Sequence, residues 1–368
     1  MKYHVAFYGI RGGAGGLNPV MRNLMNQTVK SGIKTSLIIH NVPLELDLLH
    51  PDVDVIRLPG VHQDLRFLPL ALCLARTRPT HLLSNREWGN YNSVMAKLLS
   101  HTSTKLIFRV GNPLEATLKR RNPLKRRLRA GKMRFSYDRA HLIICNSMKI
   151  KDDVVAYTGV PNDKTVVLNN PSISDEILDL AHKPPVIPIR KATGEKIIVA
   201  IGRLARQKSF DTLLRALSIS LKQIPSRLLL IGDGKERQNL QGLCRRLAIE
   251  KHVDFMGYQN NPYSYLKRAN LFVLSSAWEG SPNCLIEALA LGVPVVATDC
   301  PTGPREILQN GRYGPLVPVG DHVAMASAIV DVLSDPLPSE LLKQAARPFH
   351  AHTATREYLK AMGVLNGT

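Results

Sequence analysis

The chain has few aromatic residues, few cysteines and no long apolar run, and each shortage excludes a class of protein. No apolar run reaches the roughly 18 residues that a membrane-spanning helix needs. The five cysteines form no C-x-x-C pair and the twelve histidines no metal-spaced set, so a structural zinc site is not expected. The thiols should be reduced and half-buried. The N-terminal residues 1–10 read as a first strand and not as a signal peptide, which predicts a cytoplasmic location.

Acidic residues are also few: 29 stand against 49 basic ones, and the net charge of +20 predicts an anionic partner. The densest basic run lies between residues 119 and 134 and contains no acid. Leucines alternate with its cations, which favours contact with an anionic bilayer or a phosphate-bearing acceptor, although a solvated surface is the commoner role of such runs. Without zinc-finger spacing or an RNA-binding aromatic motif, nucleic acid is not expected. The predicted membrane patch consists of Lys119, Arg120, Arg121, Lys125, Arg126, Arg127 and Arg129.

Strand-like apolar runs alternate with helix-like amphipathic runs along the whole chain, as in α/β proteins with parallel sheets. The alternation stops at a proline-rich stretch and then restarts, which predicts two domains. We expect a first domain at residues 1–180, a linker at 181–195, a second domain at 196–345, and a C-terminal helix at 346–368.

Two glutamates seven residues apart are the most informative feature of the second half. Glu279 and Glu287 flank Gly280-Ser281-Pro282-Asn283-Cys284-Leu285, and a strand-like run precedes them. Proline suits the first helical turn, and the amides that follow it point outward and favour an anion. This turn is a plausible cradle for a sugar nucleotide, with Glu287 on the ribose hydroxyls and Glu279 near the sugar. Two surface glutamates at a strand–helix junction are the simpler alternative.

Glycines end three other strand-like runs. Gly202 is followed by Arg203 and Lys208, and Gly232 ends a run with a tight turn. Such cations at the carboxyl end of a strand lie where open α/β sheets bind ligands. Near the N-terminus, Gly13 and Gly15 belong to a glycine-rich loop that suits close approach to a phosphate. That loop does not complete the dinucleotide fingerprint, so a nicotinamide enzyme is disfavoured.

In combination, the Gly202–Lys208, Gly232, Glu279–Glu287 and Asp299–Glu306 elements resemble the retaining family-4 glycosyltransferases. The resemblance is close over residues 196–335 and loose over the N-terminal half. It implies the GT-B fold, in which two Rossmann-like domains face each other across a cleft and a final helix returns to the N-terminal domain. The Asp299–Glu306 and 311–321 stretches look most like bacterial enzymes that use UDP-hexoses or UDP-N-acetylhexosamines to build surface polysaccharides.

The resemblance also implies roles for single residues. Glu279, Arg203 and Lys208 would be catalytic, with the two cations stabilising the departing diphosphate in a metal-independent reaction without a cofactor. Gly13, Gly15, Gly202, Gly232, Glu287 and the residues from Gly280 to Leu285 would bind the donor. Relatives carry a sugar-contacting histidine in the first domain where this chain has other residues, so acceptor or sugar contacts fall to Arg86, Arg109 or Asn112.

The sequence therefore predicts a glycosyltransferase that moves a hexose or N-acetylhexosamine from a nucleotide sugar, with UDP expected, to a polyprenyl-diphosphate-linked or other glycan acceptor. The enzyme would sit on the inner face of the cytoplasmic membrane. A nucleotide-sugar epimerase or hydrolase of the same fold is an alternative. A non-catalytic basic protein that binds nucleotide or nucleic acid is another.

Overall fold

The computed structural model describes residues 2–10, 18–40, 46, 48–62, 65–111, 123–190 and 192–365, with the side chains of 123–126 and 128 left out. The chain divides into two compact units. Unit 1 comprises Met1–Ser172 and Ala351–Thr368, and unit 2 comprises Ile173–His350. The chain thus crosses between the units after residues 172 and 350, so residues 181–195, which the sequence suggested as a linker, lie within unit 2.

Unit 1 is built on a seven-stranded parallel sheet in the order β3-β2-β1-β4-β5-β6-β7. Buried apolar side chains line both faces of the central strands, as expected for a sheet covered on both sides. The strands are β1 His4–Tyr8, β2 Lys34–His40, β3 Asp54–Leu58, β4 His81–Asn85, β5 Lys105–Val110, β6 Leu142–Cys145 and β7 Thr165–Val167.

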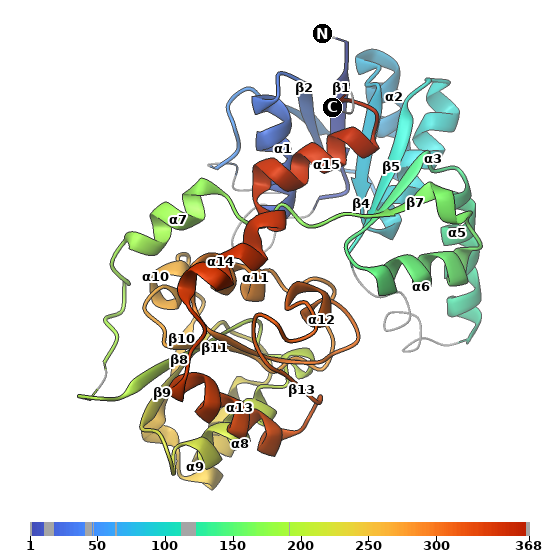
Figure 1. Ribbon diagram of the computed structural model, residues 1–368. Coiled ribbons are helices and arrows are strands. Elements are labelled where there is room, and N and C mark those ends of the chain that lie inside the picture. The colour runs from blue at the N-terminus through green and yellow to red at the C-terminus, as the bar shows by residue number, and fades with distance from the viewer. Residues whose placement is uncertain are drawn as a thin grey trace. The chain divides into compact units, whose positions relative to one another are not determined.

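Helices cover both faces of this sheet, and the longer ones are α1 Pro19–Lys30, α2 Phe67–Thr77, α3 Glu87–Ser100, α5 Pro123–Asp138, α6 Met148–Thr158 and α15 Ala351–Ala361. One face is packed by α2, α3, α5 and α6. The other is packed by α1 and α15, which lie side by side (Figure 1). Local capping defines the ends: Ser147 accepts from the Ile150 amide at the start of α6, and Gly159 ends it with φ 70°.

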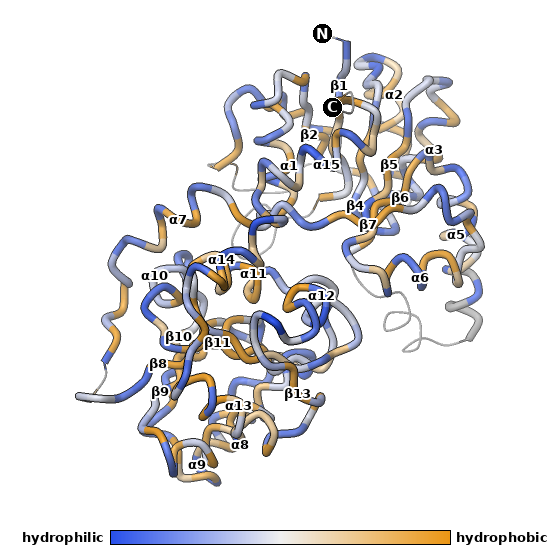
Figure 2. The backbone as a smooth tube through the Cα atoms, in the orientation of Figure 1, coloured by the Kyte–Doolittle hydropathy of each residue, from blue (hydrophilic) through white to orange (hydrophobic). Residues whose placement is uncertain are grey.

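Unit 2 holds a six-stranded parallel sheet in the order β10-β9-β8-β11-β12-β13. Its strands are β8 Lys196–Ile201, β9 Ser226–Ile231, β10 Val253–Gly257, β11 Leu271–Leu274, β12 Val295–Thr298 and β13 Leu316–Val317. Strands and adjoining segments near the sheet are largely apolar in Figure 2, which agrees with their burial. The strand-like run expected before Glu279 is β11, and the runs expected to end at Gly202 and Gly232 are β8 and β9.

The helices of unit 2 are α7 Asp175–His182, α8 Phe210–Ser220, α9 Arg237–Leu247, α10 Tyr263–Leu266, α11 Asn283–Ala290, α12 Pro304–Ile307, α13 His322–Ser334 and α14 Ser339–Ala346. One core joins the sheet to α8, α9 and α13, and a second joins it to α10, α11 and α14. After α7 the described residues up to 194 form no helix or strand.

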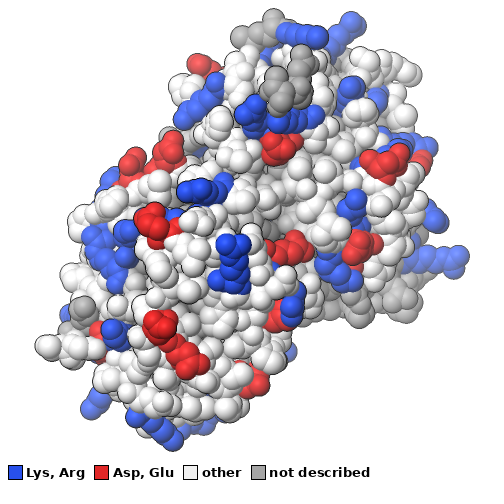
Figure 3. Space-filling view, in the orientation of Figure 1, with Lys and Arg blue, Asp and Glu red and all other residues white. Residues whose placement is uncertain are grey.

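Two properties of the whole chain are visible at this level. In the part of the chain that the structure describes, none of the helices has the length and apolarity to cross a membrane. Basic and acidic side chains are interspersed on the face drawn in Figure 3, so the excess of positive charge is not gathered into a single patch there.

Candidate functional site

The sequence motifs of unit 2 meet at the carboxyl edge of its sheet. From β8 the strand order runs outward to β10, and the chain then returns to β11 on the other side of β8. This reversal is the topological switch point at which open α/β sheets bind ligands. The segment after β8 contains Gly202, Arg203 and the 3₁₀ turn Arg206–Lys208, and the segment after β11 contains Glu279.

Glu279 and Lys208 form the central ion pair of this edge. Lys208 Nζ lies 2.6 Å from Glu279 Oε1, and Ser276 Oγ donates to the same oxygen at 2.6 Å. Both members of the pair are largely withdrawn from solvent. No hydrogen bond from a described residue reaches Glu279 Oε2. One carboxylate oxygen is therefore fixed by the protein, and the other is available to a ligand.

The charge of Lys208 is secured by its surroundings. Burial by itself would lower the pKa of Lys208. The electrostatic effects of Cys284 and Glu279 are larger together, so the pKa of Lys208 is raised. Burial raises the pKa of Cys284 to about 11, so this thiol is neutral near pH 7. Glu279 therefore supplies the compensating charge at neutral pH, and Lys208 stays cationic.

Three further hydrogen bonds hold the two segments together. The Ala277 amide donates to the Gln207 carbonyl at 2.8 Å, and Gln207 Nε2 donates to the Trp278 carbonyl at 3.0 Å. Ser275 Oγ donates to the Lys208 carbonyl at 2.8 Å. The positions of Lys208 and Glu279 are thus set by the backbone as well as by their own ion pair.

A third segment, after β12, supports the loop of Glu279 from behind. Thr302 Oγ1 donates to the Glu279 carbonyl oxygen. Gly303 has φ 91°, and a Cβ there would lie 2.7 Å from Pro282 Cδ, so only glycine fits this close approach. Arg305 forms a two-pronged ion pair with Asp299. This pair ties the residue after β12 to the first turn of α12.

Glu287 lies on α11, almost completely buried, and differs from Glu279 in its electrostatic setting. Burial raises the pKa of Glu287 to about 7, while a hydrogen bond with Tyr263 and the charge of Lys208 pull it in the opposite direction. The side chain is therefore partly protonated near neutral pH.

The start of α11 differs slightly from the prediction. Pro282 is the residue before the helix, and the helix begins at Asn283. The Leu285 amide donates to the Pro282 carbonyl at 3.1 Å, so it is already used within the first turn. No comparable backbone bond is formed by the Cys284 amide among the described residues. The Leu285 amide, one of those that follow the proline, is therefore not available to an anion without breaking this bond.

The glycine turns after β8 and β9 touch each other. Gly232 has φ 133°, and a Cβ on it would lie 2.0 Å from the Gly202 carbonyl oxygen. A Cβ on Gly234 would lie 2.3 Å from the Leu204 carbonyl oxygen. The Gly232 position therefore holds the segment after β8 in place and is glycine for a steric reason. Arg203, on that segment, is exposed and has no ion pair or hydrogen bond with a described residue.

The candidates of unit 1 have different surroundings. Arg86 follows β4, is exposed, and has φ 79°. Arg109 is buried at the end of β5, where its guanidinium donates to Asn170 Oδ1 at 2.5 Å and to Tyr358 Oη at 3.3 Å. Arg109 thereby ties β5 to the segment after β7 and to α15. A contact of Arg86 or Arg109 with the acceptor or the sugar stays a prediction.

Several predicted residues lie outside the described part of the chain: Gly13, Gly15, Asn112, Lys119, Arg120 and Arg121, together with the side chains of Lys125 and Arg126. Of the remaining membrane-patch residues, Arg127 is exposed. Arg129 forms a two-pronged ion pair with Glu87.

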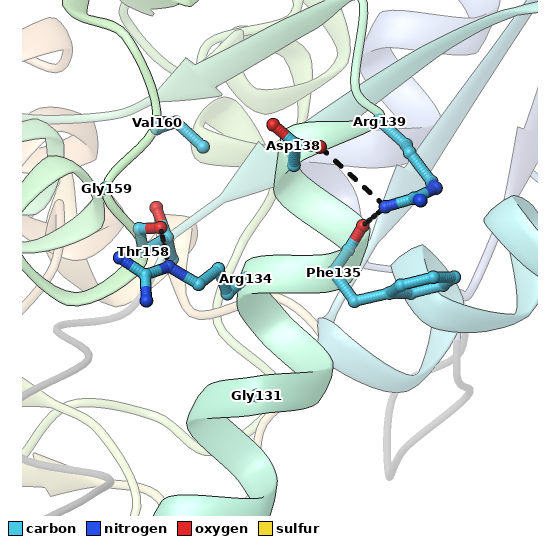
Figure 4. A pocket seen from close by; sticks show the side chains of 8 residues that line it. All are labelled: Gly131, Arg134, Phe135, Asp138, Arg139, Thr158, Gly159 and Val160. Carbon is cyan, nitrogen blue, oxygen red and sulfur yellow. Dashed lines mark hydrogen bonds and ion pairs between the residues drawn. The ribbon is translucent and has the colours of Figure 1, made fainter.

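A separate hollow of about 420 Å³ lies in unit 1 between α5 and the end of α6 (Figure 4). Arg134 Nε donates to the Thr158 carbonyl at 3.1 Å and so caps α6. Arg139 lies over the Phe135 ring and pairs with Asp138 at 3.7 Å. Both helices run back toward the amino ends of the strands, so this hollow lies away from the carboxyl edge of its sheet. Its arginines are engaged within the protein.

Two hydroxyls and one amide that support the loop of Glu279 were not predicted from the sequence. They belong to Ser276, Thr302 and Gln207. The only signal in the sequence is that Ser276 and Thr302 come a few residues after apolar strand-like runs. The cysteines are all free, and four of them are buried, which is more burial than expected.

Comparisons with known proteins agree with this architecture. Residues 187–348 match the family model described as Glycosyl transferases group 1, and residues 14–172 match Glycosyltransferase Family 4. HepE of Anabaena, solved in complex with UDP and glucose, superimposes with a TM-score of 0.75 at 18% identity, covering 99% of this chain and 100% of that one.

Two curated bacterial relatives are also similar. An N-acetylgalactosamine-N,N'-diacetylbacillosaminyl-diphospho-undecaprenol 4-alpha-N-acetylgalactosaminyltransferase of Campylobacter jejuni is 28% identical over 246 residues, 67% of this chain and 65% of that protein. The lipopolysaccharide core biosynthesis glycosyltransferase LpsE of Rhizobium meliloti is 32% identical over 192 residues, which are 47% of this chain and 55% of that protein. The matched segments span less than two thirds of either relative. With both halves matched by their family models and the fold shared along the whole length, the chain belongs to the family-4 glycosyltransferases of GT-B fold.

Proposed function

We propose that this protein is a retaining glycosyltransferase that moves a hexose or N-acetylhexosamine from a UDP-sugar to a lipid-linked glycan acceptor in the synthesis of a cell-surface polysaccharide. The observation that carries the proposal is the convergence of Lys208, Glu279 and Glu287 at the switch point of the unit 2 sheet. The names of the Campylobacter and Rhizobium relatives, and the UDP and glucose bound by HepE, support this choice of donor and acceptor.

The geometry supports a donor-binding role for each of these residues. Glu287 accepts hydrogen bonds from the ribose hydroxyls, which favours its ionised form in the complex. The Cys284 amide and the positive end of α11 face the diphosphate. Arg203, which is exposed beside the same edge, adds a planar charged donor. Glu279 offers Oε2 to the sugar, while Lys208 and Ser276 hold Oε1 and fix its orientation.

The chemistry requires stabilisation of a departing nucleoside diphosphate and of a sugar ring that becomes cationic. Lys208 and Arg203 neutralise charge on the leaving phosphate, and the Glu279 carboxylate faces the ring. The acceptor oxygen attacks the anomeric carbon from the side that the diphosphate leaves. Its proton passes to the departing phosphate oxygen, so configuration is retained without a covalent enzyme intermediate. We propose that this reaction needs no metal, and turnover that stops in EDTA would contradict that point.

The acceptor side belongs to unit 1 in this proposal. Arg86, at the carboxyl end of β4, and the region beyond Arg109 are the candidates for contact with the glycan. An acceptor carried on a lipid places the enzyme at the inner face of the cytoplasmic membrane, and the basic run from Lys119 onward suits that surface.

The first test is thermal stabilisation by nucleotides. We expect the melting temperature of the wild type to rise with UDP and not with GDP, ADP or CMP, because binding to the folded state alone stabilises it. Glu287→Ala should abolish the rise. Glu340→Ala, at an exposed glutamate of the same unit, is the matched control and should keep it.

A rise with all four nucleotides, or one that survives in Glu287→Ala, would argue against the donor site as described. Turnover then separates the enzyme alternatives. A transferase consumes UDP-sugar at a rate that depends on the acceptor, whereas an epimerase or hydrolase of the same fold does not need one.

A further inference from the structure

Helix α2 is apolar on both of its sides. Its inner face buries Leu70 and Leu74 in the core of unit 1. Its outer face carries Leu68 and Leu72, and Leu65 precedes the helix in line with them at the i, i+3, i+7 spacing of one helical stripe. Leu72 is 70% exposed. The helix stands out as mostly orange in Figure 2. A helix that is apolar all round normally lies inside a protein, so its outer face calls for a partner.

Helix α3 extends this apolar surface. It packs directly beside α2 in the layer that covers one face of the sheet. Leu98 and Leu99, in its last turn, are each about half exposed. Single exposed leucines are ordinary, but a stripe on one helix with two more on the helix packed beside it favours an interaction surface.

Cations outnumber acids in the segment that carries these leucines, although, besides burial, the nearby charge of Asp54 on β3 raises the pKa of the Cys73 thiol on α2. Residues 65–111 contain seven Lys and Arg residues and one acid, Glu87. Glu87 lies at the start of α3, where Arg129 pairs with it. Arg76 and Arg78, at the end of α2, are exposed, and Lys97 is half-buried near the end of α3. An apolar patch with a basic border complements an anionic partner.

We propose that the outer face of α2 and the last turn of α3 dock on an anionic lipid bilayer. The leucines enter the boundary below the headgroups, and Arg76, Arg78 and Lys97 contact the lipid phosphates. The inference deepens the membrane contact of the proposed function, and it rests on that function only in so far as the acceptor is lipid-linked. The outer face of α2 and the last turn of α3 share no residue with the basic run at 119–129.

The charges favour lipid over a second copy of the chain. Two such faces meeting each other would enclose the cations of both copies in one interface, which costs electrostatic energy. A bilayer with acidic headgroups supplies the opposite charge and a flat apolar layer, and it needs no shaped groove on the protein.

The test is co-sedimentation with vesicles. We expect the wild type to bind vesicles of phosphatidylcholine with phosphatidylglycerol, and to bind phosphatidylcholine alone far more weakly. Leu68→Glu with Leu72→Glu should lower binding about tenfold or more, because two inserting side chains become charged. Val323→Glu, at a 60% exposed apolar residue of α13 in unit 2, is the matched control and should bind as the wild type does. Arg76→Gln with Arg78→Gln should weaken binding and flatten its salt dependence.

Wild-type binding by the leucine double variant would overturn the proposal. So would a wild-type dimer that this variant splits while neither protein binds vesicles, since the face would then join two copies. Leu72→Gln, a milder change at the most exposed position, keeps the test valid if the double variant does not fold. The UDP-induced rise in melting temperature should be unchanged in every variant. Failure of vesicle binding is therefore distinguishable from failure of the donor site.

Discussion

At the scale of single residues, the two glutamates of one motif have opposite settings. Glu279 is tied by an ion pair to Lys208 and by a hydrogen bond to Ser276. Glu287 is buried without an ion pair to any described residue, and burial raises its pKa to about 7. Spacing in the sequence predicted that both face one ligand, but it gave no means of telling a paired carboxylate from a desolvated one.

The raised pKa of Glu287 makes stability depend on pH. Below its ordinary pKa of 4.5 the group is protonated in both the folded and the unfolded chain. As pH rises toward about 7, the unfolded chain releases the proton first, so the folded state loses stability, by about 3 kcal/mol at most. Glu287→Gln removes this loss.

We therefore expect the melting temperature of Glu287→Gln, without nucleotide, to equal or fall below that of the wild type near pH 5 and to exceed it at pH 8. Differential scanning calorimetry across this range measures the difference. Glu340→Gln, at an exposed position, should show no such crossover. A constant difference between Glu287→Gln and the wild type at all pH values would contradict the assigned burial effect.

At the scale of elements, the site depends on how closely the turns after β8 and β9 approach each other. Gly232→Ala would place a Cβ 2.0 Å from the Gly202 carbonyl, at a φ that alanine rarely adopts. We expect a loss of about 3 kcal/mol or more, together with loss of the UDP-induced rise in melting temperature, because the segment of Arg203 and Lys208 must move. Urea unfolding measures the first effect and a thermal shift the second.

Gly242→Ala is the internal control for that change. Gly242 lies within α9, where an added Cβ meets nothing closer than 3.6 Å. Alanine should raise stability there by about 0.5–1 kcal/mol and leave UDP binding intact. Equal effects of the two substitutions would show that the Gly232 turn is not sterically required.

The elements themselves were predictable because their signals are local. Apolar runs ending in glycine predicted strands and turns, and Pro282 predicted the start of α11 to within one residue. Contacts distant in sequence were not predictable. Gln207 bonds to Trp278 across 71 residues, and Arg109 reaches Tyr358 across 249. No pattern in the sequence indicates either contact. Arg109, which was expected to contact the acceptor or the sugar, is for this reason found buried within unit 1.

At the scale of the whole molecule, the chain contains separate cores for its two units. Each cluster of buried apolar residues lies within one unit of the described chain. Two units with independent cores are expected to unfold in two calorimetric transitions, because neither core depends on contacts within the other. A nucleotide bound to unit 2 should raise the midpoint temperature of the unit 2 transition only.

Arg109 provides the complementary perturbation. It is buried in unit 1, where it donates hydrogen bonds to Asn170 and Tyr358. Asn170 lies just before the chain passes into unit 2, and Tyr358 lies on α15, just after the chain returns to unit 1. Arg109→Met removes two hydrogen bonds from a charged donor and should lower the free energy of unfolding of unit 1 by about 2–3 kcal/mol. The midpoint temperature of the transition that UDP raises should stay unchanged. Arg57→Met, at an exposed arginine of β3, should leave both transitions unchanged. A single transition that responds to UDP and to Arg109→Met alike would mean that the two units unfold as one, and the division of the chain into independent cores would then be wrong.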